Sequence, residues 1–189
     1  MAWIATVEPS EAKGDLQDIF EAIASARGGI ADVHRVQSLN PRAIRAHLDL
    51  YKAVVFQKST LSRIMRERIG VIVSASNGCR YCVRHHAEAL RALNDEATII
   101  DALGEGEVPD ELPPAEIAML RWAKAGAVEP ARSTEAEVRD LRAHGFDDRA
   151  ILDAALTTGY FSFVNRLVLL LGVHVEPDLE NTCRRVEME

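Results

Sequence analysis

Apolar residues return every three or four positions along almost the whole chain of 189 residues, which predicts amphipathic helices and no hairpin. Side chains that can cap a helix, prolines and glycines separate the apolar blocks. We expect helices over residues 79–93 and 97–103, a helix that begins at Pro113-Pro114, and further helices capped by Ser10, Asn40, Ser59 or Thr60, Ser133 or Thr134, and Asp147. The pattern predicts an all-α fold, a bundle of packed helices in a single domain over residues 1–189.

Composition limits the classes of partner. Hydrophobic residues make up 48% of the chain, enough to bury a core without disulfides. The 29 acidic residues outnumber the 22 Lys and Arg, so the net charge is -7 and binding to nucleic acid is not expected. The first residues lack a secretory pattern, and the apolar run over 167–173 is far shorter than the roughly 20 residues that cross a bilayer. We therefore expect a cytoplasmic protein with no membrane partner.

Two of the three cysteines form a close pair. Cys79 and Cys82 are three residues apart, while Cys183 lies in a polar C-terminal tail, residues 176–189, and is treated as incidental. Three cysteines are too few for a disulfide framework, and in a reducing compartment a close pair is more often catalytic or metal-binding. The first turn of a helix lowers the pKa of a thiol, so the pair is a candidate nucleophile.

Helical spacing selects the residues around this pair. His86 follows Cys82 by four positions and shares an arc of roughly 60° with both sulfurs, so we expect it to be the base, whereas His85 points about 100° away. Glu67 precedes Cys79 by twelve residues, and an antiparallel return would bring its carboxylate toward His86, to orient it or pass protons. Being one turn from His86, Cys82 is the expected attacking thiol and Cys79 the more accessible, resolving one; the opposite order remains open.

The stretch ERIGVIVSASNGCRYCVRHH, residues 67–86, resembles the AhpD-like alkylhydroperoxidase group of the carboxymuconolactone decarboxylase superfamily. AhpD enzymes with a redox cycle typically carry a histidine where this chain has Tyr81. That tyrosine, the doubled histidine and the segment 160–166 look more like the branch called "peroxidase-related". The resemblance implies an AhpD-like helical bundle with a redox core at about residues 40–175, a disulfide-forming cysteine pair, hydroperoxide reduction and a homo-oligomer.

On this basis we expect a thiol-dependent peroxidase that uses Cys82, Cys79, His86 and Glu67, with Tyr81, His85 and Asn77 as accessory residues. Its substrate would be a hydroperoxide, and its electrons would come from an external dithiol such as a lipoyl domain or a thioredoxin-like protein. No metal or organic cofactor is needed for this chemistry.

Other readings of the same residues stay open. Cys79, Cys82 and His86, with Glu67 as a fourth ligand, could bind zinc in a metal-binding or interaction protein. A decarboxylase or isomerase, as in cysteine-free members of the superfamily, is a further alternative, against which the cysteine pair argues. Glu67 taken alone resembles a solvated helix residue among arginines.

Outside the motif, the remaining histidines are expected at the surface or at helix ends: His34, His47, His144 and His174. Arg166, within an apolar helix, needs a partner, which we expect at a subunit interface. The apolar residues 167–171 exceed what one face of a surface helix needs, which fits burial between subunits.

Overall fold

The computed structural model describes residues 2–176, whose regular structure is entirely helical, as predicted. Contacts divide the chain into two compact units, one with the described residues up to Leu50 and from Arg166 on, the other with residues 51–165. Each unit is described by itself, and a single domain over 1–189 stays a prediction. Cys183 lies outside the described residues.

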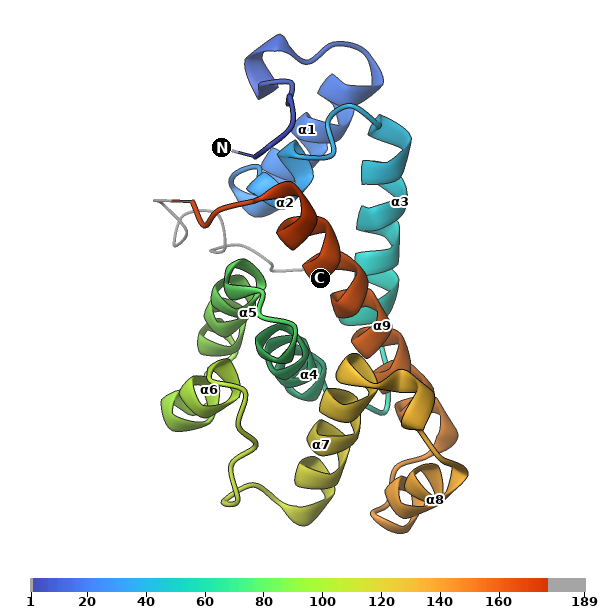
Figure 1. The fold of residues 1–189 in the computed structure, drawn as a ribbon. Helices are drawn as coiled ribbons and strands as arrows, with labels where there is room; N and C mark the ends of the chain where they lie inside the picture. The colour runs from blue at the N-terminus through green and yellow to red at the C-terminus, as the bar shows by residue number, and fades with distance from the viewer. Residues whose placement is uncertain (1, 177–189) are drawn as a thin grey trace. The chain divides into compact units, whose positions relative to one another are not determined.

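The first unit contains the short 3-10 helix η1 (Pro9–Glu11), α1 (Asp15–Arg27), α2 (Asp32–Arg35) and most of α3 (Pro41–Tyr51) (Figure 1). Ser10 lies within η1 and does not cap α1, which begins after Gly14, so this predicted cap is wrong. α1 ends at Gly28, whose left-handed backbone closes the helix. The core of this unit is apolar: Ala12, Leu16, Ile19, Phe20, Ile23 and Ile44.

Two histidines of this unit correct a second expectation. His34 and His47 are buried rather than exposed, and their ring centroids lie 5.7 Å apart. Nδ1 of His47 also lies 2.9 Å from Nε2 of Gln37. The polar partner allows the imidazole to be buried at an acceptable cost.

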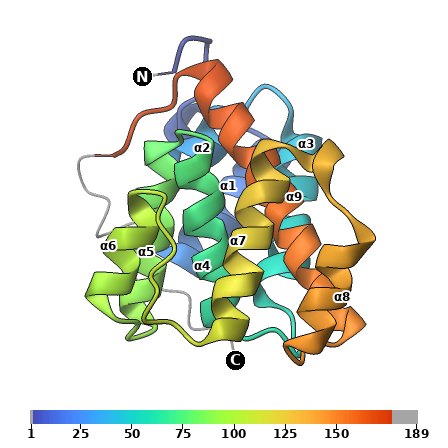
Figure 2. The same cartoon turned by 60° about the horizontal axis from the view of Figure 1, so that its bottom comes forward.

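The second unit is built around one central helix. It contains the π-helix η2 (Lys52–Phe56), α4 (Arg63–Ser76), α5 (Arg80–Ala92), α6 (Ala97–Gly104), α7 (Pro114–Val128), η3 (Pro130–Arg132), α8 (Glu135–Ala143) and α9 (Asp148–Leu171) as far as Asn165. Figures 1 and 2 both show α4 between α5 and α7. Ten consecutive residues of α4, from Met65 to Ser74, are buried. Glu67 therefore lies in the interior, and the solvated reading of this residue is wrong.

The helix ends of this unit show which caps were predicted correctly. Ser62 caps α4 by accepting from the N–H of Met65 at 3.1 Å, so the expected caps Ser59 and Thr60 are wrong. Those two hydroxyls donate instead to carboxylates of Asp153 and Asp147. The caps of α8 and α9 are as predicted, with a capping box at Thr134 and Asp147 accepting from the N–H of Ala150 at 2.7 Å.

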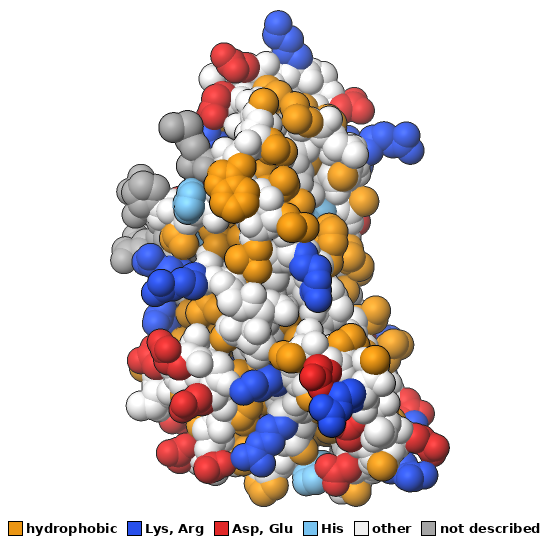
Figure 3. All heavy atoms as spheres, viewed as in Figure 1, with side chains coloured by type: hydrophobic (Ala, Val, Ile, Leu, Met, Phe, Trp, Pro, Cys, Tyr) orange, Lys and Arg blue, Asp and Glu red, His pale blue; other side chains and the backbone are white. Residues whose placement is uncertain are grey.

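The helix α9 carries exposed apolar side chains, namely Leu152, Leu156, Phe163, Leu169 and Leu170. By length and composition alone α9 could cross a bilayer, but core helices of soluble proteins pass the same test, and 44% of its most apolar window is buried. Arg166 is exposed rather than enclosed in a core. On the face that Figure 3 shows, acidic and basic side chains are interspersed over α6, α7 and α8.

Candidate functional site

The two cysteines meet at the start of α5. Gly78 adopts a left-handed backbone (φ 70°), which glycine accepts without strain, and turns the chain from α4 into α5. Cys79 is the N-cap residue and Cys82 lies in the first turn, so their sulfurs are 2.6 Å apart. Both are buried, with 0% and 3% of their surface exposed, and Cys79 is not the more accessible thiol that was expected. The contact allows a disulfide to form with little movement.

The sulfurs have opposite electrostatic tendencies. The contact with Cys82 lowers the pKa of Cys79 despite its burial, whereas burial and the neighbouring sulfur raise the pKa of Cys82 well above its ordinary value. A negative charge on the pair is therefore favoured on Cys79, at the N-terminus of α5. The spacing to His86 favours Cys82 as the deprotonated thiol. In the resting pair, however, the negative charge is favoured on Cys79.

Asn165 of α9 is a site residue that the sequence analysis did not assign. Its amide is fully buried, donates to Oγ of Ser74 at 3.0 Å, and accepts from Nδ2 of Asn77 at 2.9 Å. Hydrogen bonding from Asn165 also lowers the pKa of each thiol, as a smaller contribution. The accessory candidate Asn77 thus reaches the site through Asn165. The available signal was an amide in an otherwise apolar helix.

Glu67 and His86 form the contact that their spacing predicts. The carboxylate is fully buried, and its Oε2 lies 2.6 Å from Nδ1 of His86, across α4 and α5. Burial raises the pKa of Glu67, but the charge and hydrogen bonds of His86 and Arg63 outweigh it, so the pKa is below its ordinary value. The ionised carboxylate orients the imidazole.

Aromatic rings enclose the imidazole of His86. The ring of Phe161 lies edge-on at 4.5 Å between centroids, and Tyr51 lies at 6.3 Å and stacks on Tyr160. Gly70 makes room for Phe161, because a Cβ at this position would be only 2.5 Å from the ring. Within residues 2–176 His86 makes no hydrogen bond to either sulfur. The expected base is therefore one helical turn from Cys82 but not in contact with it.

Tyr81 and His85, the other accessory candidates, pack on each other. They are four residues apart on α5, largely buried, with ring centroids 4.3 Å apart. His86, and not His85, is the imidazole that contacts Glu67. An accessory role for Tyr81 and His85 stays a prediction.

The zinc reading depends on four side chains converging. In the described part of the chain no group of three or more His, Cys, Asp and Glu side chains has the geometry to hold a metal ion. Glu67 uses one oxygen for His86 and the other for Arg63. The described geometry therefore offers no preformed ligand set.

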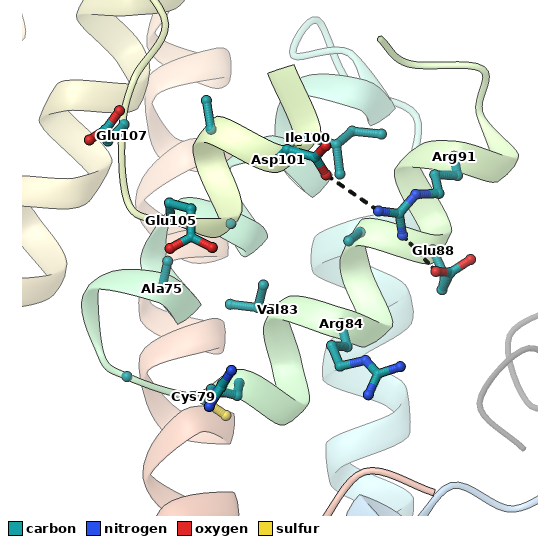
Figure 4. A pocket seen from close by; sticks show the side chains of 15 residues that line it. Ala75, Cys79, Val83, Arg84, Glu88, Arg91, Ile100, Asp101, Glu105 and Glu107 are labelled. Carbon is teal, nitrogen blue, oxygen red and sulfur yellow. Dashed lines mark hydrogen bonds and ion pairs between the residues drawn. The ribbon is translucent and has the colours of Figure 1, made fainter. Parts of the chain in front are cut away.

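A polar pocket of about 1070 Å³ lies beside the pair, between α5, α6 and the C-terminal end of α4 (Figure 4). Cys79, Arg80 and Arg84 contribute to one wall, and acidic residues that include Glu105 and Glu107 contribute to the other. The pocket gives polar molecules a way to the start of α5.

Comparisons with known proteins match a region that contains the cysteine pair. A model of the "Carboxymuconolactone decarboxylase family" matches residues 41–125. The chain superposes with a TM-score of 0.86 on a protein from Ralstonia eutropha JMP134 described as an alkylhydroperoxidase AhpD core and uncharacterized peroxidase-related protein. The two are 25% identical, and each chain is covered to 97%. A peroxidase-related protein from Silicibacter sp. TM1040 gives a TM-score of 0.84 at 27% identity, over 97% of this chain and 96% of that one. YdfG of Bacillus subtilis (strain 168), described as uncharacterized, is 24% identical over 132 residues, 70% of this chain and 88% of YdfG.

Proposed function

The chain belongs to the AhpD-like carboxymuconolactone decarboxylase superfamily, and on that premise we propose that it is a thiol-dependent peroxidase that reduces hydroperoxides through a Cys79–Cys82 disulfide. One observation carries the proposal. Two buried sulfurs lie 2.6 Å apart, and Cys82 is one helical turn from an imidazole that is oriented by a buried carboxylate. These are the parts that a dithiol cycle with proton transfer requires.

The first step oxidises Cys82. The pair carries one negative charge, which moves from Cys79 to Cys82 when the Cys82 proton passes along the sulfur–sulfur contact. The Cys82 thiolate attacks the terminal oxygen of the hydroperoxide, an S–O bond forms, the O–O bond breaks, and an alkoxide leaves. His86 passes the proton of the Cys79 thiol to this alkoxide, which becomes the alcohol.

The second step closes the disulfide. The Cys79 thiolate attacks the sulfenic acid of Cys82, the S–S bond forms, the S–O bond breaks, and hydroxide leaves and takes a proton from solvent. An external dithiol then reduces the disulfide by two successive exchanges and is itself oxidised to a disulfide. We propose that this reductant is a lipoyl or thioredoxin-like protein. The pocket beside Cys79 supports an approach of the reductant through the pocket.

We also propose a cytoplasmic homo-oligomer. The exposed leucines of α9, among them Leu169 and Leu170, support a contact between subunits, because exposed apolar residues gathered on one helix are typical of interfaces.

Single-turnover oxidation tests the function. Reduced protein is titrated with an alkyl hydroperoxide, and its free thiols and the alcohol formed are counted. We expect two thiols lost and one alcohol formed per chain. The Cys79→Ser variant should accumulate a sulfenic acid that dimedone traps at Cys82, and Cys82→Ser should form none. Survival of both thiols after one equivalent of peroxide overturns the proposal, and trapping only in Cys82→Ser reverses the order of attack.

A further inference from the structure

Arg63 holds the oxygen of Glu67 that His86 does not use. Its Nε and Nη2 donate to Oε1 of the carboxylate at 3.0 and 2.5 Å, while Nδ1 of His86 lies 2.6 Å from Oε2. The three side chains form a continuous row from the first turn of α4 to α5. We propose that Arg63 is a positioning residue that acts through Glu67 to fix which nitrogen of His86 carries the proton.

The guanidinium of Arg63 is itself held in place. Its central carbon lies 3.6 Å from the centroid of the Phe56 ring, in the π-helix η2, and three-quarters of its side-chain surface is covered. An arginine above an aromatic face gains a cation–π interaction and loses freedom to rotate. The two nitrogens aimed at one oxygen therefore meet Glu67 in a defined geometry.

Arg63 keeps Glu67 ionised in a place that disfavours charge. Burial raises the pKa of this carboxyl, and only the charges and hydrogen bonds of His86 and Arg63 bring the net pKa below its ordinary value. An ionised carboxylate only accepts hydrogen bonds, so the nitrogen of His86 that faces it must carry a proton. The neutral imidazole then has its proton on Nδ1 and leaves Nε2 free as a base.

Removal of the guanidinium should reverse this state. Without Arg63 the burial of Glu67 is opposed by His86 alone, and the carboxyl is protonated more readily. A protonated carboxyl can donate to Nδ1, and the single proton of the neutral imidazole then moves to Nε2. The base that the peroxidase proposal needs would be lost although neither His86 nor Glu67 had changed.

Arg66 is the other cation of α4 near Glu67, and it cannot replace Arg63. Its Nη1 donates to the carbonyls of Val54 and Gln57, at 3.3 and 2.9 Å. The charge of Arg66 interacts with Glu67 and with two residues of α9, Asp153 and Arg149. No hydrogen bond joins Arg66 to Glu67. The role of Arg63 thus rests on direct contact, not on the positive charge of α4 in general.

Nuclear magnetic resonance of the imidazole nitrogens tests the inference independently of enzymatic activity. In the wild-type protein with a neutral imidazole, we expect the proton on Nδ1 and Nε2 unprotonated. In Arg63→Gln the proton should move to Nε2 in a substantial fraction of molecules, and Arg63→Lys, which keeps the charge, should restore most of the wild-type state. Arg139→Gln, which removes a comparable i,i+4 partner of Glu135 on exposed α8, is the matched control and should change nothing.

The outcomes separate this inference from the proposed function on which its catalytic meaning rests. If the proton lies on Nε2 in the wild type, or if Arg63→Gln leaves the tautomer unchanged, the positioning role is wrong, and the wild-type measurement needs no folded variant. If the tautomer changes while no hydroperoxide is reduced, the positioning role stands and the peroxidase proposal fails. With both correct, kcat of Arg63→Gln should fall by about tenfold or more with KM nearly unchanged, since general-base assistance contributes at least this much.

Discussion

Nδ1 of His86 and Oε2 of Glu67 lie 2.6 Å apart, although nineteen residues separate them in the chain. The contact joins the buried face of α4 to the middle of the cysteine helix α5. Because Glu67 has no contact with water, its ionisation depends entirely on its two partners, His86 and Arg63.

Glu67→Gln should change how stability depends on pH. The pKa of Glu67 in the folded chain is below its ordinary value of 4.5. A lowered folded pKa means that the unfolded chain binds the proton more tightly, so Glu67 contributes stability above pH 4.5 that is lost as pH falls through the folded pKa. In urea unfolding, the wild type should lose more stability between pH 6 and pH 3.5 than Glu67→Gln does. An equal loss in both proteins would contradict the assignment.

Gly70→Ala should disturb His86 from a distance. The new methyl group would meet the Phe161 ring at 2.5 Å, and the ring packs on His86, so we expect a loss of about 1–3 kcal/mol from overpacking and a shifted imidazole resonance. Gly159→Ala is the control, since a Cβ at this exposed helical position meets nothing within 4 Å and should be neutral or stabilising. Chemical denaturation measures both, and equal stability of the two variants would refute the packing argument.

Asn165→Leu should raise the pKa of Cys79. The amide's hydrogen bonding favours the thiolate, and an apolar side chain of similar size removes it. Thiolate absorbance at 240 nm, followed as a function of pH, should move to higher pH in this variant. Thr157→Val removes another buried polar group of α9, whose hydroxyl donates within its own helix to the carbonyl of Asp153 at 2.6 Å, and should leave the thiol titration in place. A titration of Asn165→Leu that matches the wild type would remove Asn165 from the site.

Charges on the exposed leucines should dissociate the oligomer. If Leu169 and Leu170 lie between subunits, Leu169→Glu with Leu170→Glu buries charges there and should yield a smaller species by size exclusion with light scattering. Leu39→Glu, at another exposed leucine, serves as the control and should keep the wild-type mass. A wild-type mass for the double variant would place the interface elsewhere.

Local patterns in the sequence were sufficient for the helices and for part of the site. Apolar spacing predicts the all-α fold, because helix formation and capping by Thr134 or Asp147 depend on neighbours within a few residues. The turn at Gly78 and the three-residue spacing of Cys79 and Cys82 likewise place the two sulfurs together. The choice of Ser62 over Ser59 as a cap was not predictable, because Ser59 is diverted to Asp153, 94 residues away.

Only the tertiary structure decided the state of the charged and polar groups. Glu67 stands among arginines in the sequence and resembles a solvated residue, but packing of α4 between α5 and α7 buries it against His86 and Arg63. The relative pKa of the two thiols, the place of Asn165 and the space that Gly70 leaves for Phe161 also arise from contacts between distant segments. The sequence by itself determined which residues could carry the chemistry. Burial and long-range partners decided their protonation, because both depend on the surroundings that the fold creates.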